Sequence, residues 1–103
     1  MTCVSLGKVT DTAGAQTRLT TDTTIKACRI LFRGCNANAG TLVSVGLTGF
    51  TPGGAGMIGE ILKSSSYSDP IDLQAENNQL TVADYAVKPA TNGDGVYVSY
   101  YQI

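Results

Sequence analysis

Apolar and polar residues alternate along much of the chain, which is the pattern of β-strands with one buried face. The clearest example is the segment TIKACRILF, residues 24–32. One of its sides holds Cys28, Ile30 and Phe32, and the other holds Ala27, Arg29, Leu31 and, just beyond the segment, Arg33. We therefore expect an inner strand whose first set of side chains enters the core and whose two arginines face water or a neighbouring molecule.

Short segments of the same character recur, separated by turn residues about every eight to twelve positions. They are residues 3–10, 17–20, 41–47, 71–74, 80–87 and 96–101. Residues 58–63 fit either a short strand or a helical turn. The chain shows no internal repeat and no second domain. The pattern predicts one all-β domain over residues 1–103, a β-sandwich or jelly roll of seven to eight short strands.

The strongest turn and strand signals stand at the end of the chain. NGDG, residues 92–95, joins two dipeptides that are typical of tight β-hairpins, and it leads directly into the Val- and Tyr-rich segment 96–101. We expect this last strand to lie inside a sheet, paired on both edges. Tyr97 and Tyr101 share one of its faces and Tyr100 takes the other, which we interpret as a strand with one tyrosine-lined core face.

The composition changes this picture in one respect. Apolar residues make up 43% of the 103 residues, enough for a core, but charged residues make up only 15%, where about a quarter is usual. Such a surface is expected to be partly covered by a partner or by other copies of the chain. A small β domain with a surface rich in Ser, Thr and Asn is the alternative.

Charge and hydropathy also bear on partners. Seven Lys and Arg residues and eight Asp and Glu residues give a net charge of −1 with no basic cluster, so we expect no nucleic-acid partner. No apolar run is long enough to span a membrane, and the first residues lack the apolar core of a signal peptide. We expect the chain to be made and folded in a reducing cytoplasm.

Candidate catalytic chemistry is sparse. The sequence contains no histidine, the commonest general base, and Cys28 lies among apolar neighbours where a thiol is usually inert. The glycine-rich residues 51–57 lack the phosphate-binding pattern of a P-loop. Two pairs of acids are conceivable carboxylate partners, Asp69 with Asp72 and Asp84 with Asp94. We interpret them as solvated loop acids and predict no catalytic residue, no cofactor, no metal site and no enzymatic activity.

The three cysteines form an odd set. Cys28 and Cys35 are seven residues apart, so on one extended strand they would be about 23 Å from each other. A disulfide between them requires the chain to turn, which Gly34 and Asn36 permit. We favour free thiols over this disulfide. Without histidine or a Cys-x-x-Cys motif, a zinc site is not expected.

Several segments together resemble a known family. In chain order they are GKVTDTAGAQTRLTT (7–21), KACRILFRGCNANAGTLVSVG (26–46), PIDLQAENNQLTV (70–82) and NGDGVYVSY (92–100). Their order and spacing, over nearly the whole chain, resemble small virion proteins encoded by tailed bacteriophages and prophages. Each segment alone is a β-turn signature of low specificity, and their order carries the likeness.

The resemblance implies a compact β-sandwich displayed on a phage particle. Most concretely, it implies a capsid decoration (cement) protein that binds the major capsid protein as a homo-oligomer, with a trimer favoured. The virion would then be its location, after synthesis in the cytoplasm of a host bacterium. The alternative is a tail, neck or fibre module that binds another virion protein or a host glycan. Glycan binding predicts an exposed aromatic platform built from Tyr67, Tyr85 or Tyr97.

A glycine-rich loop contains the candidate contact residues. Phe50, Pro52, Met57 and Ile58 are apolar side chains in or beside residues 48–57. Interfaces concentrate apolar and aromatic side chains at their centres, so these four are the candidate interface residues. The alternative is that they tuck under their own loop.

Overall fold

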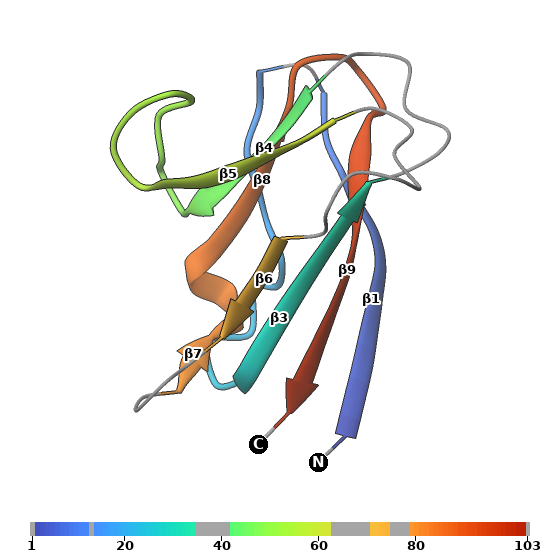
Figure 1. Cartoon of the computed structure of the whole chain (residues 1–103), viewed down its shortest axis with the longest axis vertical. Helices are drawn as coiled ribbons and strands as arrows, with labels where there is room; N and C mark the ends of the chain where they lie inside the picture. The colour runs from blue at the N-terminus through green and yellow to red at the C-terminus, as the bar shows by residue number, and fades with distance from the viewer. Residues whose placement is uncertain (1, 13, 35–41, 63–70, 75–78, 103) are drawn as a thin grey trace.

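The computed structural model describes residues 2–12, 14–34, 42–62, 71–74 and 79–102, and these residues form two antiparallel sheets that pack as a β-sandwich (Figure 1). In the first sheet the strand order is β1 (Thr2–Thr10), β9 (Gly95–Gln102), β3 (Lys26–Gly34) and β6 (Ile71–Gln74), and β7 (Leu80–Thr81) also pairs with β3. In the second sheet the order is β2 (Thr17–Arg18), β8 (Tyr85–Pro89), β4 (Leu42–Leu47) and β5 (Met57–Leu62). The predicted all-β sandwich is confirmed.

The strand count differs slightly from the prediction. The described residues contain nine strands, two of which, β2 and β7, have only two residues. The segment 80–87, predicted as one strand, is divided by a 3-10 turn, η1 (Val82–Asp84), so that β7 joins one sheet and β8 the other. Residues 57–62 form a strand rather than a helical turn.

The hydrophobic core lies between the two sheets and receives side chains from both. Its fully or nearly fully buried members are Val9, Leu19, Ala27, Ile30, Phe32, Val43, Val45, Val82, Tyr85, Val87, Val96, Val98 and Tyr100. Most are β-branched or aromatic, the residue types that pack well on a pleated surface. Because each strand supplies every second residue to this layer, the remaining side chains form the two outer faces.

Strand β9 is the central element of the first sheet. It pairs with β1 on one edge and with β3 on the other, as its sequence predicts. Thr2 is paired with Gln102, so the two ends of the described chain lie side by side at the bottom of Figure 1. The hydrogen bonds between β1 and β9 therefore hold both ends of the described chain in one sheet.

The orientation of β9 corrects one prediction. Its core face carries Val96, Val98 and Tyr100, whereas Tyr97 is 49% exposed and Tyr101 is half-buried on the outer face. The face that holds two tyrosines is thus the outer one. Valine occupies two of the three core positions Val96, Val98 and Tyr100, so the core side of β9 is mostly valine rather than tyrosine.

The structure also corrects the prediction of which residues at the start of β3 face the core. The register between β3 and β9 shifts between Ala27 and Arg29, which marks an irregularity of the β-bulge kind. Ile30 and Phe32 are fully buried, as predicted, but Cys28 is only half-buried and Ala27 takes the core position at 0% exposure. A slip of one residue exchanges the two faces of a strand, so the simple alternation assigned Ala27 and Cys28 to the wrong sides.

Residues 92–95 do not form the expected hairpin. They connect β8 in one sheet with β9 in the other, so the turn crosses between the layers. The hydroxyl of Thr10 donates a hydrogen bond to the carbonyl of Asp94 (2.7 Å), and the N–H of Gly93 donates to the carbonyl of Asp11 (3.3 Å). The hairpin prediction assumed that consecutive strands pair with each other, whereas here each pairs with partners distant in sequence.

Candidate functional site

Two surfaces of the sandwich carry side chains that the core does not use. The first is the outer face of the sheet that contains β1, β9, β3 and β6, which we call the outer tyrosine face. The second is the end of the β4–β5 pair, residues 47–58, which we call the β4–β5 end. The predicted interface loop belongs to the second surface, and the first was not singled out from the sequence.

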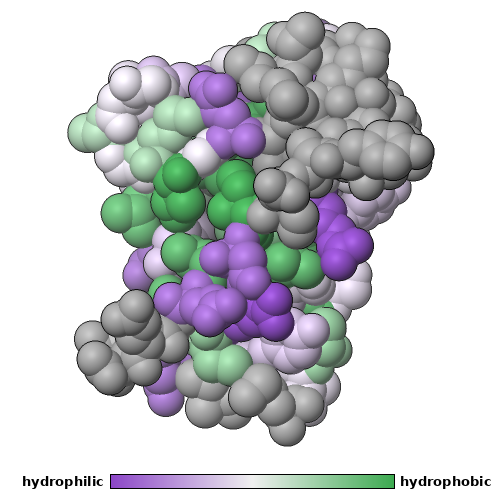
Figure 2. Space-filling model, in the orientation of Figure 1, coloured by the Kyte–Doolittle hydropathy of each residue, from purple (hydrophilic) through white to green (hydrophobic). Residues whose placement is uncertain are grey.

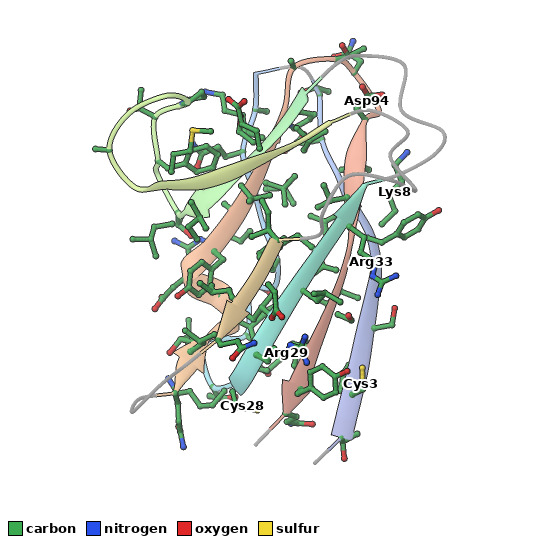
Figure 3. The ribbon with its side chains drawn as sticks, viewed as in Figure 1. Cys3, Lys8, Cys28, Arg29, Arg33 and Asp94 are labelled. Atoms are coloured by element: carbon green, nitrogen blue, oxygen red, sulfur yellow. The ribbon has the colours of Figure 1, made fainter. Side chains whose placement is uncertain are left out.

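The upper row of the outer tyrosine face places an aromatic ring between two cations. Tyr97 of β9 is paired directly with Lys8 of β1 on one side and with Arg33 of β3 on the other. Directly paired residues point to the same face with Cβ atoms about 5 Å apart, and all three side chains are exposed. Figure 3 shows Lys8 and Arg33 extending from the same side of the sheet, away from β4 and β8.

The lower row of this face carries a third cation in a different setting. Arg29 lies opposite Tyr101, with its guanidinium carbon 5.5 Å from the ring centroid. It also donates hydrogen bonds to both carboxylate oxygens of Asp72 on β6, at 2.8 and 2.6 Å. These hydrogen bonds from Arg29 hold the pKa of Asp72 below its ordinary value. Cys3, exposed and free, lies on the other side of Tyr101.

The charges of the two rows therefore differ. In the part of the chain that the structure describes, the Arg29–Asp72 pair is the one ion pair found. Lys8 and Arg33 have no acidic partner among those same residues. Within the described residues, the outer tyrosine face thus carries two positive charges without an acidic partner around an exposed ring, on a chain whose net charge is −1.

The four predicted contact residues at the β4–β5 end differ in their exposure to solvent. Phe50 is only 4% exposed, so it follows the alternative of tucking under its own loop. Pro52 and Ile58 are exposed, and Met57 is half-buried. Interface use of these side chains stays a prediction, with Pro52 and Ile58 the two best placed to make contact.

Two glycines explain how the loop can bury Phe50. A Cβ atom at Gly46 would lie 2.8 Å from Cγ of Phe50, and one at Gly56 would lie 3.2 Å from its Cβ. The backbone N–H of Phe50 donates to the carbonyl of Leu47 (2.9 Å), and its own carbonyl accepts from the side-chain amide of Gln16. The ring therefore packs directly on the backbone, and glycine is needed on both sides.

Sequence reasoning missed one exposed apolar residue at this end. Leu47 alternates with the core residues Val43 and Val45, a pattern that predicts burial, yet it is 47% exposed. It is the last residue of β4, where the sandwich ends, and Ile58 on the neighbouring strand is 37% exposed. Figure 2 shows hydrophobic side chains gathered across the middle of the molecule, at the height where β4 ends and β6 begins.

The candidate acid pairs do not form a catalytic arrangement in the described residues. Asp72 is bound to Arg29, and its proposed partner Asp69 lies outside the described residues. Asp84 is the last residue of η1, directly before β8, whereas Asp94 is buried in the turn that follows β8. The five residues of β8 therefore separate these two acids, about 16 Å at 3.3 Å per residue, which is too far for both to act on one bond.

The cysteines and tyrosines considered as candidate functional residues lie in different environments. The Sγ of Cys28 lies 3.6 Å from the carbonyl oxygen of Tyr101, and Cys35 lies outside the described residues. Of the tyrosines proposed for a glycan platform, Tyr85 is buried and its burial raises its pKa, while Tyr67 is outside the described part.

Among the described residues, no group of three or more Cys, Asp or Glu side chains is placed to hold a metal ion. The same residues include no helix that could cross a membrane.

Comparison of the chain with protein-family models, with curated proteins and with solved structures gave no match. Function is therefore inferred from the order of the sequence segments and from the chemistry of the two surfaces.

Proposed function

We propose that this chain is a structural virion protein of a tailed bacteriophage, most concretely a capsid decoration protein. In this role it binds the major capsid protein and stabilises the head. The order of the strand and turn segments supports the proposal, since it resembles that of small phage virion proteins. A small, rigid β-sandwich with a weakly charged surface suits a component that is largely covered in an assembly.

The observation that carries the proposal is the exposed apolar β4–β5 end. Leu47 and Ile58 are large apolar side chains left in water on neighbouring strands, with the exposed Pro52 in the loop between them. The N–H of Leu47 donates to the carbonyl of Gly56 (3.0 Å), so the strand ends are held together without a partner. A rigid apolar projection of this kind loses little conformational entropy when it docks.

The proposed assembly is a homo-oligomer, with a trimer favoured. A decoration protein binds at many symmetry-related positions, so weak single contacts add up through multivalency. The protein is made in the cytoplasm of the host bacterium and then located on the capsid surface. Its role requires no catalytic group and no cofactor.

Copy number per particle tests the proposal. Purified virions would be analysed by quantitative mass spectrometry, with the major capsid protein as the internal reference. A ratio near one to one is the expected result, because a decoration protein covers the whole shell. Complete absence from the particle would overturn the virion assignment, and a few copies per particle would move the protein to the neck, tail or fibre.

The second candidate is a tail, neck or fibre accessory module that contacts another virion protein or a host glycan. The observation in its favour is the exposed ring of Tyr97, one of the three tyrosines expected for a glycan platform. Aromatic rings present a large apolar surface with a polar tip, a combination suited to sugar contact. Binding to a glycan array that is lost in Tyr97→Ser would support this candidate. An array without any bound glycan would remove it.

A further inference from the structure

The row formed by Lys8, Tyr97 and Arg33 has no part in the proposed capsid contact, which lies at the β4–β5 end on the second sheet. Three adjacent strands, β1, β9 and β3, present these side chains side by side. Neighbouring strands are about 4.8 Å apart, so the backbones of Lys8 and Arg33 are separated by about 10 Å. The strand pairing on both sides of β9 fixes this spacing before any ligand arrives.

The chemistry of the row favours an anionic occupant. Neither Lys8 nor Arg33 has an acidic partner in the described part of the chain, whereas Arg29 in the lower row is paired with Asp72. Arg33 offers a planar fork of donors that matches a carboxylate, and Lys8 offers a compact charge. The ring of Tyr97 between them supplies contact area at a low cost in side-chain entropy.

The overall charge argues against a nucleic acid as that occupant. A phosphate backbone is long and uniformly charged, and it would meet a chain with a net charge of −1 and a pI near 5.0. Sequence-tolerant binding of single strands also uses successive stacking rings, and the second tyrosine of this face, Tyr101, is half-buried and stacked with Arg29. Two cations about 10 Å apart match a few carboxylates better than a long polyanion.

We propose that the Lys8–Tyr97–Arg33 row binds an acidic segment of a protein partner. Carboxylates of the segment pair with Lys8 and Arg33, and its backbone or an apolar side chain lies on the ring of Tyr97. Tyrosine and arginine are the residue types that contribute most to binding at protein interfaces. The inference does not depend on the virion proposal, because it concerns another surface and is tested on the isolated protein.

The test is a titration of the ¹⁵N-labelled chain with an acidic hexapeptide of alternating Asp and Ser, at low and at moderate salt. The expected result is a set of amide shift changes confined to β1, β9 and β3 around the row. The affinity is expected to fall as salt is raised, since exposed charges are screened over about 10 Å at 0.1 M salt. A matching hexapeptide of Lys and Ser is expected to leave the spectrum unchanged.

Two double variants separate the row from charge in general. Lys8→Gln/Arg33→Gln removes both cations but keeps long polar side chains, and it is expected to weaken binding at least tenfold. Arg18→Gln/Lys88→Gln makes the same change in net charge on β2 and β8 of the other sheet, and it is expected to bind like the unmodified chain. Both spectra are compared with that of the unmodified protein to verify that each variant is folded.

Three outcomes would overturn the proposal. The first is an equal loss of affinity in the two double variants, which would show that only net charge matters. The second is a set of shift changes located away from the row in the unmodified chain, a measurement that needs no variant. The third is tighter binding of an oligothymidylate than of the acidic peptide at the same salt, which would assign the row to nucleic acid.

Discussion

Arg29 and Asp72 join β3 to β6 through two hydrogen bonds between the guanidinium group and both carboxylate oxygens. The two residues are diagonal neighbours, since Arg29 is paired with Gln74 and Asp72 with Leu31. The same guanidinium lies over the ring of Tyr101 on the opposite side. One side chain thus connects three neighbouring strands across the outer face, including β6 at the edge of the sheet.

Removing the acid of this pair is expected to loosen β6. In Asp72→Asn the charge of Arg29 loses its partner, and the free energy of unfolding at neutral pH should fall by less than a core truncation costs, because the pair is partly exposed to solvent. Urea denaturation of the two proteins measures the loss. Asp84→Asn is the matched control, since Asp84 is an exposed acid outside this pair. An equal loss in both variants would contradict the structural role of Asp72.

The same pair makes stability depend on pH in a defined direction. The pKa of Asp72 is lowered from its ordinary value of 3.8 by the hydrogen bonds from Arg29. The stabilisation is therefore fully present above the unfolded-state pKa and is lost as the pH falls through the folded-state pKa. The difference in unfolding free energy between the unmodified chain and Asp72→Asn should be present at pH 7 and shrink as the pH falls below 3.8 and through the lowered pKa of Asp72 in the folded state. A difference that stays constant with pH would refute the assigned cause.

Gly95 is expected to be intolerant of any side chain. A Cβ atom there would collide with the backbone carbonyl oxygen of Val9, in the closely paired start of β9. Gly95→Ala should therefore lower the free energy of unfolding by about 1–3 kcal/mol, the usual cost of overpacking. Gly54→Ala is the control, because its added Cβ would make only an ordinary contact, 3.5 Å from Thr51. Thermal unfolding of both variants measures the difference in stability. A Gly95→Ala variant that is more stable than Gly54→Ala would contradict the prediction.

Leu47 and Ile58 are expected to act in binding and Phe50 in folding. Leu47→Ser and Ile58→Ser change exposed side chains, so each should cost about 1 kcal/mol of stability or less. Each variant, added to virions or capsids prepared without this protein, should bind to fewer sites than the unmodified chain, as measured by co-sedimentation. Phe50→Ala empties a buried site and should lower stability by about 3 kcal/mol. If the serine variants co-sedimented like the unmodified chain, the β4–β5 end would not be the capsid contact.

The two described cysteines are expected to react at different rates with a thiol reagent. Cys3 is exposed on β1, whereas Cys28 is half-buried beside the carbonyl of Tyr101. In a Cys35→Ser background, Ellman's reagent should modify one thiol at least about ten times faster than the other, because burial limits access of the reagent to the sulfur. Peptide mapping should assign the fast site to Cys3. Equal rates would contradict the burial of Cys28.

Local sequence reasoning succeeded where a feature depends on neighbours along the chain. Period-two alternation identified most of the strands, and the burial of Ile30 and Phe32 follows from it directly. The central position of β9 could also be predicted, because an uncharged segment rich in Val and Tyr is too apolar for an edge. The four candidate contact residues lie in or beside one loop, but Phe50 is buried beneath it, and contact by the other three stays a prediction.

The outer tyrosine face could not have been found in this way. Lys8, Tyr97 and Arg33 are far apart in the sequence and become neighbours only because β1 and β3 both pair with β9. Which face of β9 enters the core is likewise decided by packing, since tyrosines occur on both faces of the strand and Tyr100 is buried whereas Tyr97 is exposed. A single-strand pattern contains no information about either.

By itself, the sequence determined that this protein is all-β, with short strands and few charges, because β propensity and alternation act between adjacent residues. The tertiary structure decided what depends on distant contacts. The irregularity at Ala27–Arg29 set which residues of β3 face the core, and the crossing of residues 92–95 between sheets replaced a hairpin. Pairing partners are chosen by the packing of the whole sandwich, so the surfaces available for binding are properties of the folded chain alone.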